Sequence, residues 1–215
     1  MEQSSDDNSR SHYSFGDNRL AALRLKYLAA AFAPSSRLFL QSAKPGRVEL
    51  ALDLGSGIGA TTSLVRDATN APLVAGYERS RNFLAIARRR YPELTFRNID
   101  VLSPAYPDRG ADLIYCRFLL THIHRPADVL NTSVQHLRSG GRLLLEETAA
   151  LFSPVPALSR YYDLVGQLQA HHGQETLIGK KLEALARGVA RARGGVPATK
   201  PRKATNVSAG RRGYL

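Results

Sequence analysis

The sequence contains few of the residues that mark secreted, zinc-binding or membrane-spanning proteins. Its 215 residues include one cysteine, Cys116, which excludes an intramolecular disulfide, and no paired Cys/His spacing indicates a metal site. No apolar run approaches the roughly 20 residues needed to cross a bilayer, and residues 1–14 have neither the basic start nor the apolar centre of a secretory signal. These absences favour a soluble, cytoplasmic protein without a metal or a membrane partner.

Acidic residues are also scarce, with 18 Asp and Glu against 30 Lys and Arg, so the formal net charge is +12. Residues 180–215 carry ten Lys and Arg against Glu183 alone, which contributes +9 and leaves +3 for residues 1–179. The basicity is therefore a property of the C-terminal tail. We expect residues 194–215 to be a solvated, disordered extension. The alternative is that this tail is attracted nonspecifically to nucleic acid, an attraction that would weaken steeply with salt.

A glycine-rich turn between residues 48 and 60 is the feature around which the chain is organised. Residues 48–54 are mostly apolar and predict a buried strand, and residues 58–67 can begin a helix. Gly55, Gly57 and Gly59 permit left-handed backbone and a close approach of a ligand to the main chain. The free N–H groups of the helix that follows face the same ligand, so the turn predicts a nucleotide-type site.

The acidic residue before the turn distinguishes two kinds of nucleotide site. Gly55, Gly57 and Ala60 also satisfy the GxGxx(G/A) pattern of dinucleotide-binding folds. Asp53, however, suits a cationic ligand and is awkward beside a pyrophosphate. The DxGxGxG pattern resembles motif I of the class I S-adenosylmethionine-dependent methyltransferases. The resemblance implies S-adenosylmethionine as cofactor, with its methionine part held by Asp53, Gly55, Ser56 and Gly57.

Two further acidic positions extend this resemblance. Glu78 ends a strand predicted over residues 73–77, close to the spacing at which an acidic residue binds ribose hydroxyls, and Arg79 beside it is a weaker candidate to flank the adenine. Asp100 follows a strand predicted over residues 94–99. Asp100 and Val101 resemble the third signature of the family, which implies a hydrogen bond to the adenine amino group and packing on the ring. We therefore expect Asp53, Glu78 and Asp100 to share one cleft.

The remaining repeat of strands and helices predicts an α/β fold. Strands expected at 111–116 and 142–146 flank a helix at 127–137 that Ser139, Gly140 and Gly141 would terminate. The pattern gives a Rossmann-like, doubly wound, mostly parallel sheet in a three-layer α/β/α arrangement. Arg117, after the fourth strand, is a further cofactor-binding candidate. His122 is a weak candidate for a catalytic base, and a structural role for it remains the alternative.

The N-terminal region predicts two helices, at residues 19–32 and 36–42, punctuated by Pro34 and Ser35. They either pack against the sheet or, as the resemblance implies, cover the cofactor, in which case Tyr13 and Arg24 are candidates for its carboxylate end. After the sheet, helices are expected at residues 157–172 and 175–192. In the family this second region lies over the substrate.

The resemblance covers roughly residues 13–190 and then stops. A complete class I sheet has seven strands, and residues 194–215 offer no convincing strand, so we expect the last two strands to be missing and strand 5 to form an uncovered edge. The domain prediction is a disordered segment at 1–12, a methyltransferase domain at 13–193 and the tail at 194–215. Within the domain we expect lid helices at 13–45, a cofactor-binding core at 46–147 and substrate-side helices at 148–193.

Three functions are compatible with these observations. The first is an S-adenosylmethionine-dependent methyltransferase acting on a small-molecule acceptor. The second is an inactive cofactor-binding protein that serves as an interaction module, which the missing strands suggest. The third is an NAD-linked oxidoreductase, which Asp53 and Asp100 disfavour. The acceptor and the oligomeric state do not follow from the sequence.

Overall fold

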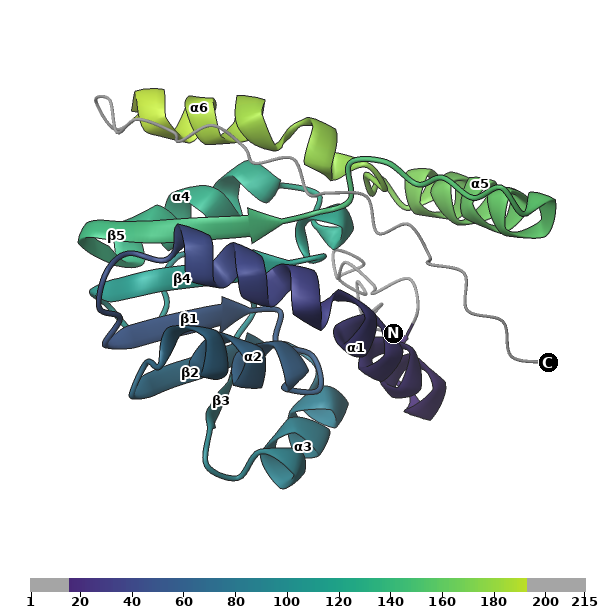
Figure 1. The fold of residues 1–215 in the computed structure, drawn as a ribbon. Helices are drawn as coiled ribbons and strands as arrows, with labels where there is room; N and C mark the ends of the chain where they lie inside the picture. Colours follow the sequence, from purple (N-terminus) through teal and green to yellow (C-terminus); the bar gives the residue numbers. More distant parts are fainter. Residues whose placement is uncertain (1–15, 193–215) are drawn as a thin grey trace, which may run out of the picture.

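A computed structural model describes residues 16–192 of the chain as a three-layer α/β/α fold (Figure 1). The predicted disordered segment at 1–12, the candidate Tyr13 and the tail at 194–215 lie outside the described residues. The elements are α1 (Arg19–Ala43), β1 (Leu50–Leu54), α2 (Ala60–Thr69), β2 (Leu73–Glu78), α3 (Arg81–Arg90), β3 (Thr95–Asn98), β4 (Ala111–Arg117), the 3-10 turn η1 (Leu120–His122), α4 (Pro126–His136), β5 (Leu137–Glu146), α5 (Pro156–His171), the 3-10 turn η2 (Ile178–Lys180) and α6 (Leu182–Ala192).

The five strands form one parallel sheet in the order β3-β2-β1-β4-β5. This order confirms the predicted doubly wound α/β fold. From β1 the chain adds β2 and β3 on one side, and it then crosses to add β4 and β5 on the other side of β1. β5 stands at one edge, and no further strand pairs with it within residues 16–192. The carboxyl ends of β1 and β4 lie side by side where the strand order reverses, which is the position of ligand sites in such sheets.

Two apolar clusters hold the layers together. On one face, side chains of α1 and α2 pack on β1, β2, β4 and β5, with Leu40, Ala51 and Leu113 fully buried. On the other face, α4 and α6 pack on the same sheet through residues such as Leu130 and Val189. Figure 1 shows α1 and α2 on the near side of the sheet and α4 on the far side. Both faces are covered, as the apolar character of the central strands indicates.

The two helices predicted before β1 form one continuous helix, α1, so that prediction was wrong. Pro34 lies inside it and removes one backbone N–H, a loss of about 3 kcal/mol in an isolated helix interior. Tertiary contacts outweigh this loss, because Ser36 and Leu40, which follow the proline, are both fully buried against the sheet. The Ser36 hydroxyl donates a hydrogen bond to Glu146 at the end of β5, 2.9 Å away. The proline predicted a break in the helix, but the packing of Ser36 and Leu40 keeps the helix continuous.

Two other boundaries also differ from the prediction. β5 begins at Leu137, five residues before the expected start, and the expected turn at 139–141 is an irregularity within it. Leu137 pairs with Ala111, but Arg142 already pairs with Leu113, so the residues between them bulge out of the ladder, and Gly140 has a φ of +76°. α6 begins at Leu182 and follows the short turn η2, whereas the sequence predicted one helix from residue 175.

Gly76 on β2 allows the glycine turn and α2 to sit close to the sheet. It pairs with Asp53 on β1, and a Cβ atom added there would lie 2.7 Å from the Thr62 hydroxyl and 2.8 Å from the Ser56 Cβ. Real Cβ atoms do not approach other atoms so closely, so a side chain at this position would push α2 or the turn away from β1. The sequence analysis had missed this glycine.

We predict that Gly76→Ala lowers the free energy of unfolding by about 1–3 kcal/mol, because the added methyl group overpacks the site beneath the turn. Gly188→Ala on α6 is the matched control, since a Cβ there meets no atom within 4 Å and alanine favours a helix more than glycine. Chemical denaturation of both variants measures the difference. A Gly76→Ala protein as stable as the wild type would contradict this packing.

Candidate functional site

The turn after β1 is built from glycines in left-handed backbone. Gly55, Gly57 and Gly59 have φ angles of +70°, +53° and +86°, values that residues other than glycine rarely adopt. The N–H groups of Gly55 and Ser56 donate to the Tyr77 carbonyl on β2, 2.9 and 3.0 Å away. A Cβ at Gly55 would lie 2.9 Å from the Leu119 side chain, so the turn also abuts the loop that follows β4. The turn is thus held by its neighbours, with Gly55 half-buried and Gly57 and Gly59 buried.

Asp53 lies beneath this turn and is almost completely buried, at 1% exposure. Its Oδ2 atom accepts hydrogen bonds from the hydroxyls of Thr61 and Thr62, both 2.7 Å away in the first turn of α2. Burial raises the pKa of Asp53 to about 6, and the two threonine hydroxyls and the charge of Arg117 oppose this effect. Asp53 therefore ties the start of α2 to β1 and keeps its charge at neutral pH.

Glu78 closes the same turn from the end of β2. Its Oε2 atom accepts a hydrogen bond from the Gly57 N–H at 2.9 Å, and its Oε1 atom accepts one from the Ser80 N–H at 2.7 Å. Burial raises the pKa of Glu78, and these backbone donors counteract the shift. Ser80 in turn caps α3 by accepting from the Phe83 N–H. The carboxylate thus meets the glycine turn, and each oxygen retains a lone pair for a further donor.

Asp100 lies two residues beyond the end of β3 and is half-exposed. Its Oδ1 atom accepts from the Leu102 N–H at 2.9 Å, and its Oδ2 atom is 3.9 Å from the Arg79 guanidinium. Val101 is 6% exposed and belongs to the main apolar cluster. The sheet order brings the ends of β1, β2 and β3 next to one another, as the sequence analysis had expected. Most of the Val101 side chain is nevertheless used by the core.

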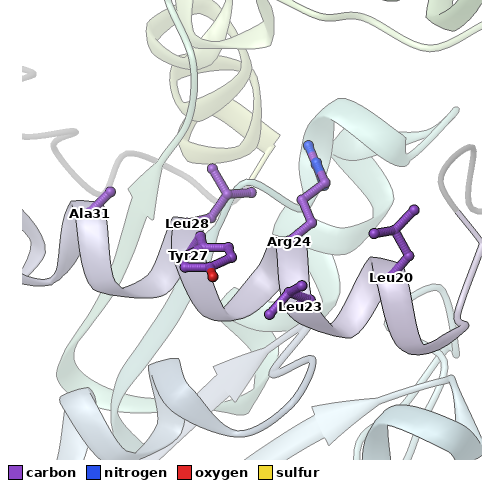
Figure 2. A pocket seen from close by; sticks show the side chains of 6 residues that line it. All are labelled: Leu20, Leu23, Arg24, Tyr27, Leu28 and Ala31. Carbon is purple, nitrogen blue, oxygen red and sulfur yellow. The ribbon is translucent and has the colours of Figure 1, made fainter. Parts of the chain in front are cut away.

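Arg117, the last residue of β4, is buried and bonds to α1. Its Nη1 atom donates to the Ser36 hydroxyl at 2.9 Å, and its guanidinium stands over the Phe118 ring at 5.6 Å. Arg24, on the N-terminal half of α1, lines an apolar hollow along that helix (Figure 2); the hollow's other lining residues are Leu20, Leu23, Tyr27, Leu28 and Ala31. No residue of the glycine turn lines this hollow.

The environment of His122 does not favour a catalytic base. Burial lowers the pKa of His122 to about 4, and the nearby charge of Arg24 adds to the effect, whereas a hydrogen bond with Gln174 opposes it. The ring is therefore neutral at pH 7 and holds a proton weakly. His122 lies in η1, at the side of the glycine turn nearest β4.

Glu147, directly after β5, is a residue that the sequence analysis did not identify as a site candidate. Its Oε1 atom accepts hydrogen bonds from the N–H groups of Leu119 and Leu120, 2.8 and 2.7 Å away, while within residues 16–192 its buried Oε2 atom has no partner. Burial raises the pKa of Glu147 to about 7. It anchors the loop whose Leu119 side chain abuts Gly55. The Glu146-Glu147 pair at a strand end was the available signal.

The described part of the chain offers no metal centre and no membrane span. No group of three or more His, Cys, Asp or Glu within residues 16–192 is placed to hold a metal ion. None of the helices in that range is both long enough and apolar enough to cross a membrane.

Comparison with known proteins finds a family model that matches the central part of the chain. A family model described as a methyltransferase domain matches residues 52–145, the segment from β1 to β5 that contains the glycine turn and all three carboxylates. Over this segment the chain is similar to methyltransferase domains of the class I S-adenosylmethionine-dependent type. This confirms the resemblance drawn from the DxGxGxG turn and from the strand-end acids.

Individual relatives of this chain are distant. It is 28% identical over 149 residues to a trans-aconitate 2-methyltransferase of Rhizobium rhizogenes, covering 56% of this chain and 58% of that protein. A second enzyme of the same name, from Methylobacterium nodulans, is 31% identical over 142 residues, covering 65% and 54%. The chain spans about half the length of the curated relatives it matches.

Solved structures share the fold. The YcgJ protein from Bacillus subtilis gives a TM-score of 0.55 at 21% identity, covering 72% of this chain and 67% of that one. Phosphoethanolamine N-methyltransferase 2 from Haemonchus contortus gives a TM-score of 0.56 at 20% identity, covering 72% and 36%. These likenesses support the Rossmann-like architecture of the chain.

We predict that Asp53→Asn stabilises the protein at alkaline pH. The folded-state pKa of Asp53, about 6, lies above its ordinary value of 3.8, so its contribution to stability is full below about pH 4 and is lost as the pH rises through 6. Asparagine avoids this loss and still accepts from the threonines. Chemical denaturation should give a gain of up to about 3 kcal/mol at pH 8 that vanishes near pH 4. A loss of stability at pH 8 would contradict the buried charge.

Proposed function

We propose that the protein transfers a methyl group from S-adenosylmethionine to a small-molecule acceptor. The observation that carries this proposal is the left-handed turn of Gly55, Gly57 and Gly59, which two buried carboxylates hold from below and from the side. A sulfonium cofactor is cationic, and Asp53 and Glu78 supply negative charge beside the backbone of the turn. A pyrophosphate would meet the same two charges unfavourably, which disfavours the NAD-linked alternative.

The residue roles within this proposal follow from position. The backbone of the glycine turn, with Ser56, holds the methionine part of the cofactor, and Glu78 receives the ribose hydroxyls through its remaining lone pairs. Asp100 accepts from the adenine amino group while Arg79 steadies its carboxylate. Val101 contributes only the small part of its surface that the core leaves uncovered. The division into lid helices at 13–45, core at 46–147 and substrate-side helices at 148–193 remains a prediction.

The chemistry requires placement more than proton transfer. The cofactor supplies an activated methyl group, and the chain must hold the acceptor atom in line with it and exclude water. His122 is a weak base at neutral pH, so we assign it no proton-transfer step. The loop from Phe118 to His122, which Glu147 anchors and which abuts Gly55, lies where an acceptor would meet the methyl group.

The acceptor to test first is trans-aconitate, because it appears in the names of several relatives that are 28–31% identical. Turnover is measured with a cofactor labelled in its methyl group, first against trans-aconitate and then against a metabolite extract. Labelled product supports the enzyme. Tight cofactor binding without turnover of any acceptor would instead support the cofactor-binding interaction module.

We predict that Glu78→Gln weakens S-adenosylmethionine binding by about 10- to 100-fold, because it removes a charged acceptor worth roughly 1.5–3 kcal/mol. Calorimetry with S-adenosylmethionine, S-adenosylhomocysteine and NAD measures the affinities, and the melting temperature checks the fold. Glu93→Gln is the control, since Glu93 is exposed and pairs only with Arg66 among the described residues. Tighter binding of NAD than of both adenosyl compounds would overturn the proposed function.

A further inference from the structure

A second layer of buried polar groups lies behind the glycine turn, on the sheet face that α1 and α2 cover. Asp53 on β1 pairs in register with Tyr115 on β4, so the two side chains point to the same face. Arg117, two residues further along β4, points to that face as well. The glycine turn and this layer therefore share Asp53, whose carboxylate lies between them.

Arg117 is held in this layer by groups from two other elements. Its Nη1 atom donates to the Ser36 hydroxyl of α1, and that hydroxyl donates to Glu146 Oε1 at the end of β5, with both distances 2.9 Å. The Tyr115 hydroxyl donates to Glu146 Oε2 at 2.6 Å. Arg117 is 9% exposed and Ser36 is fully buried. The guanidinium therefore has a fixed position, which the buried half of α1 imposes.

The charges in this layer are unequal. Its charged groups include two carboxylates, those of Asp53 and Glu146, and one guanidinium, that of Arg117. The charged groups that act on Asp53 are Arg117 from β4, which lowers its pKa, and Glu78 from β2, which raises it; α2 presents only the hydroxyls of Thr61 and Thr62. Tyr115 faces the same layer, and burial raises its pKa, so it stays neutral. Among the charged groups that act on Asp53, Arg117 is thus the one that favours a negative carboxylate.

We propose that Arg117 is a positioning residue: Ser36 and Glu146 fix it behind the glycine turn, where it keeps Asp53 negatively charged and so sets the pH range in which the site holds a cationic cofactor. The proposal rests on the proposed function for the cofactor, but its effect on Asp53 does not. The proposal also explains why α1 continues through Pro34. The continuous helix places Ser36 where its hydroxyl accepts the hydrogen bond of Arg117.

The experiment measures the pKa of the Asp53 carboxyl by carbon-13 NMR in the cofactor-free protein, together with the affinity for S-adenosylmethionine between pH 5 and 8.5. In Arg117→Met the Asp53 pKa should rise by about 1 unit or more, because a close opposite charge is lost. A rise of 1 unit weakens cofactor binding about threefold at pH 6.5 and hardly at pH 8.5. Ser36→Ala should shift both quantities in the same direction by less.

Matched variants separate this effect from general damage. Arg117→Lys keeps the charge and should restore most of the wild-type pKa of Asp53. Ser35→Ala removes a neighbouring hydroxyl that bonds only within α1, to the Phe32 carbonyl, and should change nothing. If Arg117→Met does not fold, the Asp53 pKa measured in Ser36→Ala and in Arg117→Lys tests the proposal.

An Asp53 pKa that is the same in wild type, Ser36→Ala and Arg117→Met would overturn the proposal. So would a cofactor affinity whose pH dependence is identical in all of them. A wild-type protein that does not bind the cofactor at any pH, but whose Asp53 pKa rises in the variants, would contradict the proposed function and support the role of Arg117.

Discussion

The hydrogen bonds from Thr61 and Thr62 to Asp53 are the interaction on which the rest of the site depends. They join the first turn of α2 to the end of β1 and so fix both ends of the glycine turn. The arrangement places a carboxylate in the interior, where burial disfavours its charge. A fold selected only for stability would place a neutral group there. The buried charge is therefore evidence that the turn serves a ligand that needs it.

Other parts of the structure support the same turn from different directions. Gly76 leaves room beneath it, Glu78 bonds to its backbone, and Leu119 abuts it from the loop that Glu147 anchors. Gly76 and Glu78 belong to β2 and Leu119 follows β4, so the sheet order determines which residues meet. These contacts fix the conformation of the turn from several sides.

The sequence allowed the sheet, the turn and the strand-end acids to be predicted, because each has a local signal: an apolar run, a glycine spacing or an acidic residue at a fixed interval. It did not reveal that α1 continues through Pro34, since the contacts of Ser36 and Leu40 that outweigh the proline come from residues far away in the sequence. For the same reason the sequence did not reveal that Arg117 bonds to Ser36, 81 residues earlier. Its predicted contact with the cofactor stays a prediction. The sequence near a polar residue does not show which distant residue it will bond to.

The most direct test of this account is an NMR titration of the amide resonances of Gly55, Gly57 and Gly59 with S-adenosylhomocysteine. We expect these resonances to shift and saturate together, with the Ser80 amide following because Glu78 connects it to the turn. Resonances that remain unchanged while the ligand binds elsewhere on the protein would contradict the central claim that the carboxylate-supported glycine turn is the cofactor site.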